Sequence, residues 1–142
     1  MPLTTFVGRE REVADLRELL RRSRLATLTG PGGVGKTRLA IEVVRRRGAR
    51  SAGDAVFVDL GAVSDDAAVP GAVAASLGLS AADPSAAEAV LAEWLGRRPV
   101  LLVLDNCEHV VRACASLAAE LLGRCPGLRV LATSRESLGV PG

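Results

Sequence analysis

The order of hydrophobic and polar positions along the chain predicts strands that alternate with helices. Four apolar runs have the length and composition of buried strands: residues 25–29, 55–60, 99–104 and 128–132. Apolar residues recur at helical spacing in other segments: residues 9–22, 36–47, 84–95 and 110–122, with a shorter helix that ends near Leu77. Strands and helices in this alternation favour an α/β fold with a parallel sheet and right-handed crossovers.

The helical segments also predict which residues face the sheet. We expect two inward sets: Val13, Leu16, Leu19 and Leu20 in the first helix, and Leu39, Ala40, Val43 and Val44 in the second. Asp83 before Pro84 is a typical helix start, and Gly96 is a typical helix end. Trp94 lies in the last turn of that helix, where we expect it to pack against the domain rather than to contact a ligand.

Composition limits the chain to one domain, or part of one. It has 142 residues, of which 49% are hydrophobic and only 2% aromatic, so it offers few platforms for stacking nucleic-acid bases. Arginines cluster at 17–24 and 45–50, where two predicted helices end, and cations there complement the helix dipole. The position of the two clusters and the small net charge of +2 favour solvent-exposed arginines at helix ends over a surface that binds nucleic acid.

The sequence disfavours a secreted or membrane protein, and it also disfavours a metal site formed by cysteines. No charged and apolar leader opens it and no apolar run reaches transmembrane length, so we expect a cytoplasmic protein without a membrane contact. Cys107, Cys114 and Cys125 are odd in number and contain no C-x-x-C pair. Buried thiols are therefore favoured over the alternative, a metal site that these cysteines form with His109.

The eight residues after the first predicted strand have the pattern of a phosphate-binding loop. Gly30-Pro31-Gly32-Gly33-Val34-Gly35-Lys36-Thr37 matches G-x-x-x-x-G-K-[ST] at every position. Its glycines allow backbone N–H groups to approach phosphate oxygens, and the start of the next helix adds unpaired N–H groups. Lys36, the only lysine of the chain, would contact the β- and γ-phosphates, and the Thr37 hydroxyl would ligate Mg²⁺. The alternative is a Gly-rich turn without a ligand.

A second motif follows at a later strand. Val100-Leu101-Leu102-Val103-Leu104-Asp105 has the form of a Walker B strand, in which an acidic residue at the carboxyl end of a strand holds Mg²⁺. Ligands of open α/β sheets bind outside the carboxyl ends of the strands, so Gly30, Asp105 and residues 133–135 should converge on one crevice. Arg135 could then reach the γ-phosphate, although a surface position for this arginine is the alternative.

These motifs occur in a fixed order and together carry a resemblance. Phe6-Val7-Gly8-Arg9-Glu10, the phosphate loop, Asp105-Asn106-Cys107-Glu108-His109 and Thr133-Ser134-Arg135 resemble the STAND-class signalling ATPases, close to the NB-ARC group. The likeness covers the chain from Phe6 to Gly142 and is greatest to the ATPase module of large bacterial transcriptional regulators. It implies a P-loop NTPase fold, a three-layer sandwich, with residues 1–24 as an adenine-side segment and helix and residues 25–142 as a partial core of the same domain.

The resemblance also implies the site and its ligands. Adenine nucleotide, ATP or ADP, and Mg²⁺ are the expected ligands, and the partners are further domains of the same regulator or a second copy. Arg135 would act as the sensor of the γ-phosphate. The nucleotide-binding residues would be Val7, Gly8, Arg9, Gly30, Pro31, Gly32, Gly33, Val34, Gly35, Lys36, Thr37 and Arg38.

One departure from the family bears on hydrolysis. Many relatives have a second acidic residue after the Walker B aspartate, but this chain has Asn106, which cannot take a proton from the attacking water. Glu108 could serve as the base, although a glutamate near a helix start is also favourable with the helix dipole. We therefore expect tight nucleotide binding with slow hydrolysis at most.

A second departure concerns the sheet. In this fold the strand before the phosphate loop lies between the sensor strand and a fifth, later strand, and we expect the chain to end before that strand. Residues 25–29 would then form an unpaired apolar edge, as in a fragment or in a protein that needs a partner. The rival functions are a DNA-binding or scaffolding module with a structural phosphate loop, and a small-molecule kinase, for which no substrate pocket or basic lid is visible.

Overall fold

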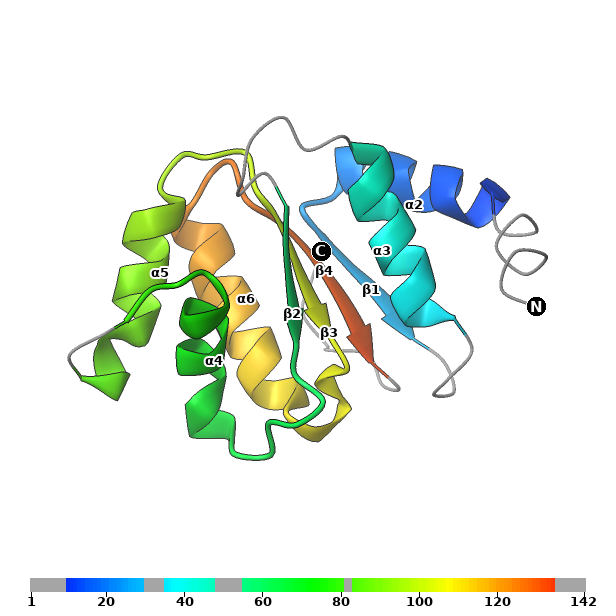
Figure 1. The fold of residues 1–142 in the computed structure, drawn as a ribbon. Coiled ribbons are helices and arrows are strands. Elements are labelled where there is room, and N and C mark those ends of the chain that lie inside the picture. Colours follow the sequence, from blue (N-terminus) through cyan, green and yellow to red (C-terminus); the bar gives the residue numbers. More distant parts are fainter. Residues whose placement is uncertain (1–9, 30–34, 48–54, 81–82, 135–142) are drawn as a thin grey trace.

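The computed structural model describes residues 10–29, 35–47, 55–80 and 83–134, and within them the four predicted strands form one parallel sheet. The strands are β1 (Leu25–Thr29), β2 (Ala55–Asp59), β3 (Leu101–Asp105) and β4 (Arg129–Ser134). Their order across the sheet is β1-β4-β3-β2, and all four arrows point the same way (Figure 1). The carboxyl ends of the strands therefore meet at one edge, as the crevice predicted from the motifs requires.

Helices alternate with these strands along the chain, as the spacing of apolar residues predicts. The α-helices are α2 (Glu10–Arg22), α3 (Lys36–Arg47), α4 (Val69–Ser76), α5 (Ala87–Leu95) and α6 (Val111–Arg124). Three short 3₁₀ turns accompany them: η1 (Asp66–Ala68), η2 (Pro84–Ala86) and η3 (Cys107–His109). None of the helices in the described ranges is long and apolar enough to cross a membrane.

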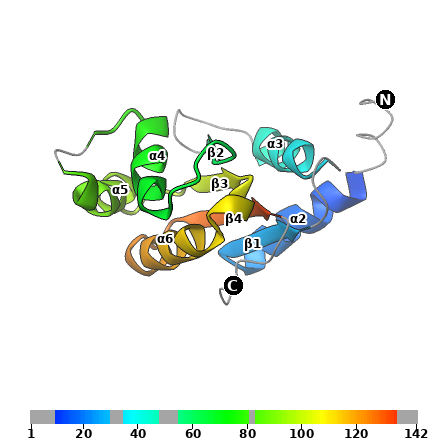
Figure 2. The same ribbon diagram turned by 90° about the horizontal axis from the view of Figure 1, so that it is seen from below.

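The helices cover both faces of the sheet, which confirms the three-layer sandwich. On β3, Leu102 and Leu104 belong to the cluster packed with α4, α5 and α6, whereas Leu101 and Val103 pack with α2 and α3. Side chains alternate between the two faces of a strand, so a strand covered on both sides is apolar throughout. All five residues of β3 are buried. Figures 1 and 2 show α4, α5 and α6 on one side and α2 and α3 on the other.

Several predicted details need correction. Leu19 is exposed, so the inward face of α2 consists of Val13, Leu16 and Leu20 alone. The helix predicted over 84–95 begins as the 3₁₀ turn η2, and Asp83 Oδ1 accepts a hydrogen bond from Ser85 N at 3.0 Å. Gly96 ends this helix with a φ of 49°, as predicted. Trp94 is half-buried against the core, with the Arg98 guanidinium 4.5 Å from its ring centroid.

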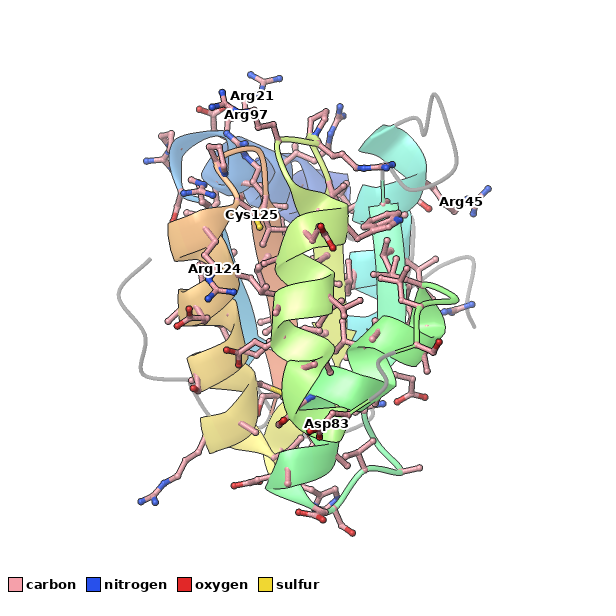
Figure 3. All side chains as sticks on the ribbon, turned by 90° about the vertical axis from the view of Figure 1, so that its left-hand side faces the viewer. Arg21, Arg45, Asp83, Arg97, Arg124 and Cys125 are labelled. Carbon is pink, nitrogen blue, oxygen red and sulfur yellow. The ribbon has the colours of Figure 1, made fainter. Side chains whose placement is uncertain are left out.

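Arginines lie in the last turns of two helices. The last turn of α2 contains Arg21 and Arg22, from the predicted cluster at 17–24, and the last turn of α6 contains Arg124. Figure 3 shows Arg21 and Arg97 at the end of the molecule opposite to Asp83. Each exposed arginine at a helix end stabilises the folded state by only a few tenths of a kcal/mol to about 1 kcal/mol. These arginines therefore add to stability but do not determine the fold.

β1 forms one edge of the sheet. It pairs with β4 from Leu25 to Thr29, and no strand of the described segments lies on its other side. Leu25 and Ala26 are buried, and the strand becomes progressively more exposed until Thr29. The order β1-β4-β3-β2 thus agrees with the predicted unpaired edge.

Candidate functional site

The two motifs converge at the carboxyl edge of the sheet. Thr37 lies in the first turn of α3, and Asp105 is the last residue of β3. The Thr37 hydroxyl oxygen Oγ1 is 3.1 Å from Asp105 Oδ1 and 2.9 Å from Oδ2. The motifs are 68 positions apart in sequence, and the parallel sheet brings them into hydrogen-bond contact. Thr37, at the end of the phosphate-loop motif, therefore lies directly beside the acidic residue of the predicted Walker B strand.

The end of the loop has the backbone conformation that the glycine pattern predicts. Gly35 has a φ of 89°, a region that favours glycine because it has no Cβ. Its carbonyl oxygen accepts the first helical hydrogen bond of α3, from Leu39 N at 2.9 Å. Lys36 follows as the first residue of α3 and is half-buried. The helix thus starts beside Asp105, where its amino-terminal N–H groups favour an anion.

Asp105 is buried and held by two hydroxyl groups. Its side chain is 1% exposed, and Thr133, itself fully buried in β4, donates from Oγ1 to Asp105 Oδ1 at 2.5 Å. The same Thr133 oxygen accepts from the backbone N–H of Asn106 at 2.9 Å. Thr133 therefore joins the ends of β3 and β4. A strand end at residue 132 was predicted wrongly, because β4 continues through Thr133 and Ser134, two polar residues that are buried.

Asn106 and Asp59, of which the sequence reasoning missed only Asp59, complete the group. Asn106 has a left-handed backbone with a φ of 61°, a region in which asparagine is one of the few tolerated side chains. Its Nδ2 donates to Oδ1 of Asp59 at 3.1 Å, and Gly61 N donates to the same oxygen at 2.9 Å. Asp59 is the last residue of β2 and the register partner of Asp105. Asp59 could have been found from the sequence, because it is an acidic residue near the end of a predicted strand.

The oxygen atoms of the site are suitable ligands for Mg²⁺. Mg²⁺ binds through hard oxygen atoms and commonly takes one or two protein oxygens, with phosphates and waters completing the shell. The Thr37 hydroxyl and the Asp105 carboxylate supply such oxygens side by side. Asp105 receives hydrogen bonds from two neutral hydroxyls, and a cation would compensate the charge of this buried carboxylate further. When bound, the ion would neutralise charge on the phosphates.

The cysteine and histidine alternative is wrong. Within the ranges that the structure describes, which include His109 and all three cysteines, no group of three or more His, Cys, Asp or Glu could hold a metal ion. Cys107, Cys114 and Cys125 are free thiols and buried, as predicted. A hydrogen bond with Cys114 and burial raise the pKa of the Cys107 thiol, and burial raises the pKa of Cys125. A raised pKa favours the protonated thiol over the reactive thiolate in both residues.

Other predicted site residues lie apart from the group or outside the described residues. Arg38 is exposed on α3. Glu108 lies in η3 before α6 begins at Val111, and it forms no hydrogen bond with Asp105 or Thr37 in the described part of the chain. Those outside the described residues are Val7, Gly8, Arg9, Gly30, Pro31, Gly32, Gly33, Val34 and Arg135.

The Thr133 hydroxyl should be important for stability. Thr133→Val removes a donor to Asp105 and an acceptor of Asn106 N–H, so buried polar groups lose their partner. We expect the free energy of unfolding to fall by about 2 kcal/mol or more in urea denaturation. Thr133→Ser keeps the hydroxyl and should lose only about 1 kcal/mol, the value of one buried methyl group. Equal losses in the two variants would contradict the role of the hydroxyl.

No protein-family model matches the chain, but it is similar to several mycobacterial proteins. It is 45% identical over 127 residues to the Mycobacterium tuberculosis protein named "Putative HTH-type transcriptional regulator Rv0890c", covering 89% of this chain. It is 42% identical over 144 residues to "Uncharacterized protein Rv0894" of the same species, covering 99% of this chain. The chain spans 14% of the length of the first relative and 36% of the second.

Solved structures share the fold. The structure of Cdc6p from Pyrobaculum aerophilum matches with a TM-score of 0.64 and 21% identity, over 90% of this chain and 39% of that one. The STAND protein with a tetratricopeptide repeat sensor from Pyrococcus horikoshii matches with a TM-score of 0.62 and 15% identity, over 95% and 21%. ORC2 of Aeropyrum pernix, solved as ADPNP and ADP complexes, matches at 0.61 with 18% identity, over 89% and 40%. The chain therefore has the α/β fold of P-loop NTPases.

Proposed function

We propose that the chain is the nucleotide-binding switch domain of a bacterial transcriptional regulator of the STAND class, close to the NB-ARC group. It binds ATP and ADP with Mg²⁺ in the cytoplasm and hydrolyses ATP slowly or not at all. The nucleotide state would then govern contacts with further domains of the same regulator or with a second copy. The observation that carries the proposal is the contact of Thr37 Oγ1 with both carboxylate oxygens of Asp105.

This contact supports nucleotide binding for a chemical reason. A structural Gly-rich turn would have no need for a buried carboxylate at the start of the following helix, because burying a carboxylate is costly. Asp105 is nevertheless 1% exposed and faces the Thr37 hydroxyl, in the arrangement that Mg²⁺ and phosphates use in P-loop proteins. The resemblance to a protein named as a transcriptional regulator supports the choice of cellular role.

Calorimetric titration with ATP and ADP, each with and without Mg²⁺, tests the proposal. We expect one nucleotide per chain and a stronger affinity for ATP when Mg²⁺ is present, because the ion would neutralise charge on the phosphates. We also expect fewer than about one ATP hydrolysed per minute, since Asn106 cannot accept a proton. Failure to bind either nucleotide at millimolar concentration would instead favour a DNA-binding or scaffolding module with a structural loop.

A further inference from the structure

The hydrogen-bonded pair of Asp59 and Asn106 is the part of the site that nucleotide binding alone does not explain. Asn106 follows Asp105 directly, and its Nδ2 lies 3.1 Å from Asp59 Oδ1. The ionised carboxylate only accepts hydrogen bonds, so the NH₂ end of the Asn106 amide must face Asp59. The chain thus has an amide after the Walker B aspartate and a carboxylate one strand away.

The position of Asp59 is fixed by the sheet and the turn that follows it. Asp59 and Asp105 are register partners at the carboxyl ends of β2 and β3, the edge at which the phosphate loop also begins. Gly61 N holds Asp59 Oδ1 at 2.9 Å, and Leu60 N donates to the Asp105 carbonyl oxygen at 2.8 Å. Both hydrogen bonds that Asp59 receives from the described residues end on Oδ1. Oδ2 receives no hydrogen bond from the described residues, so it can accept one from a water molecule.

Asp59 has an exposed carboxylate that can accept a proton, and its neighbours Asn106 and Asp105 do not. Asn106 has no basic oxygen of carboxylate strength, and Asp105 is 1% exposed and engaged by two hydroxyls. Asp59 is exposed and is linked to the residue after Asp105 by one hydrogen bond. Glu108 forms no described hydrogen bond to this group, although it follows Asn106 by only two residues.

We propose that Asp59 faces the γ-phosphate end of the bound nucleotide and is the proton acceptor for the water that attacks it, with Asn106 as its positioning residue. This inference rests on the proposed function. In the step, the water oxygen forms a bond to the γ-phosphorus, and the bond from that phosphorus to the β,γ-bridging oxygen breaks. ADP leaves with the electron pair, and one water proton passes to Asp59 Oδ2. The products are ADP and inorganic phosphate.

Affinity provides a test that does not depend on turnover. A carboxylate near the γ-phosphate repels ATP more than ADP, because ATP carries the additional negative charge. Asp59→Asn, titrated calorimetrically at constant Mg²⁺, should raise the ratio of ATP affinity to ADP affinity by about fivefold. Single-turnover hydrolysis of labelled ATP by this variant should be slower by about 100-fold or more, the usual contribution of a general base.

Asp83→Asn is the matched control. Asp83 is also exposed and accepts a backbone N–H two residues later, Ser85 N at 3.0 Å, but it lies at the start of η2 rather than at a strand end. It should change neither the affinity ratio nor the hydrolysis rate. If Asp59→Asn does not fold, Asp59→Ser keeps a side-chain oxygen that can accept hydrogen bonds from Gly61 N and Asn106 Nδ2. It also lacks the carboxylate, so it should raise the affinity ratio and slow hydrolysis in the same direction as Asp59→Asn.

The outcomes separate this inference from the proposed function. An unchanged affinity ratio in Asp59→Asn, with normal binding by the wild type, would overturn the placement of Asp59 and leave the nucleotide switch standing. Loss of turnover in Glu108→Gln but not in Asp59→Asn would overturn the role of Asp59 as proton acceptor. The absence of any turnover in the wild type would overturn this role too, even if Asp59→Asn shifts the affinity ratio. A folded Asp59→Ser variant that hydrolyses ATP as fast as the wild type would overturn it as well. A wild type that binds neither nucleotide would remove the proposed function itself.

Discussion

Lys36→Ala should abolish the binding of ATP and ADP, with affinity reduced by about 100-fold or more in calorimetric titration. Lys36 is the only lysine, it is the first residue of α3, and it is half-buried beside Thr37. A compact ammonium group that contacts two phosphates contributes charge-assisted hydrogen bonds in a partly desolvated site, and about 3 kcal/mol corresponds to that loss of affinity. The measurement is made at constant Mg²⁺ with both nucleotides.

Arg45→Ala is the control for this loss of positive charge. Arg45 is on the same helix, its side chain is 76% exposed, and it lies 3.6 Å from Glu42. An exposed cation two turns away is screened by water and salt, so affinity should change by less than about twofold. Equal effects of the two substitutions would mean that general charge attracts the nucleotide, and unchanged binding by Lys36→Ala would support the structural reading of the loop.

Gly127→Ala should destabilise the fold more than other glycine substitutions, by about 3 kcal/mol in urea denaturation. A Cβ at Gly127 would lie 2.5 Å from the Arg98 carbonyl oxygen and 2.7 Å from that of Arg97. Both contacts are with backbone atoms, which cannot rotate away as a side chain would. The neighbouring backbone is also held, because Arg129 N donates to the Val100 carbonyl oxygen at 2.9 Å. The amino ends of β3 and β4 would have to separate.

Gly123→Ala is the matched control for that substitution. Gly123 lies in α6, four residues earlier, and a Cβ there would meet nothing within 4 Å. Alanine is a better helix former than glycine, so this variant should gain about 0.5–1 kcal/mol. The two alanines should therefore move stability in opposite directions. Little or no loss of stability in Gly127→Ala would show that the turn before β4 adapts to a side chain.

The sequence predicts the site well where one continuous segment carries the chemistry. The phosphate loop and the run that ends in Asp105 are each recognisable without knowledge of the sheet, and both strands are where their apolar residues indicate. The contact of Thr37 with Asp105 follows from the parallel topology, since carboxyl ends of parallel strands share an edge. Leu19 was misassigned because it is at the margin of the apolar stripe, where helical spacing alone does not decide exposure.

The roles of Asp59, Thr133 and Ser134 could not be predicted, because they depend on residues that are close in space but distant in sequence. Asp59 is 47 positions from Asn106, and their contact exists only because β2 lies next to β3. Thr133 and Ser134 have the polarity of a loop, so the predicted strand stopped before them. Thr133 can be buried because the Asp105 carboxylate and the Asn106 N–H provide its hydrogen-bond partners. Polar residues inside a fold are predictable only when their partners are known.

The edge position of β1 has a consequence for how nucleotide affinity should be measured. β1 leads directly into the phosphate loop, and no described strand pairs with the side opposite to β4. Any strand that joined this side would restrain the residues that precede the loop, so association and ligand affinity would be thermodynamically linked and each would alter the other by the same factor. Titrations at two protein concentrations would then give different dissociation constants, and their ratio would measure that linkage.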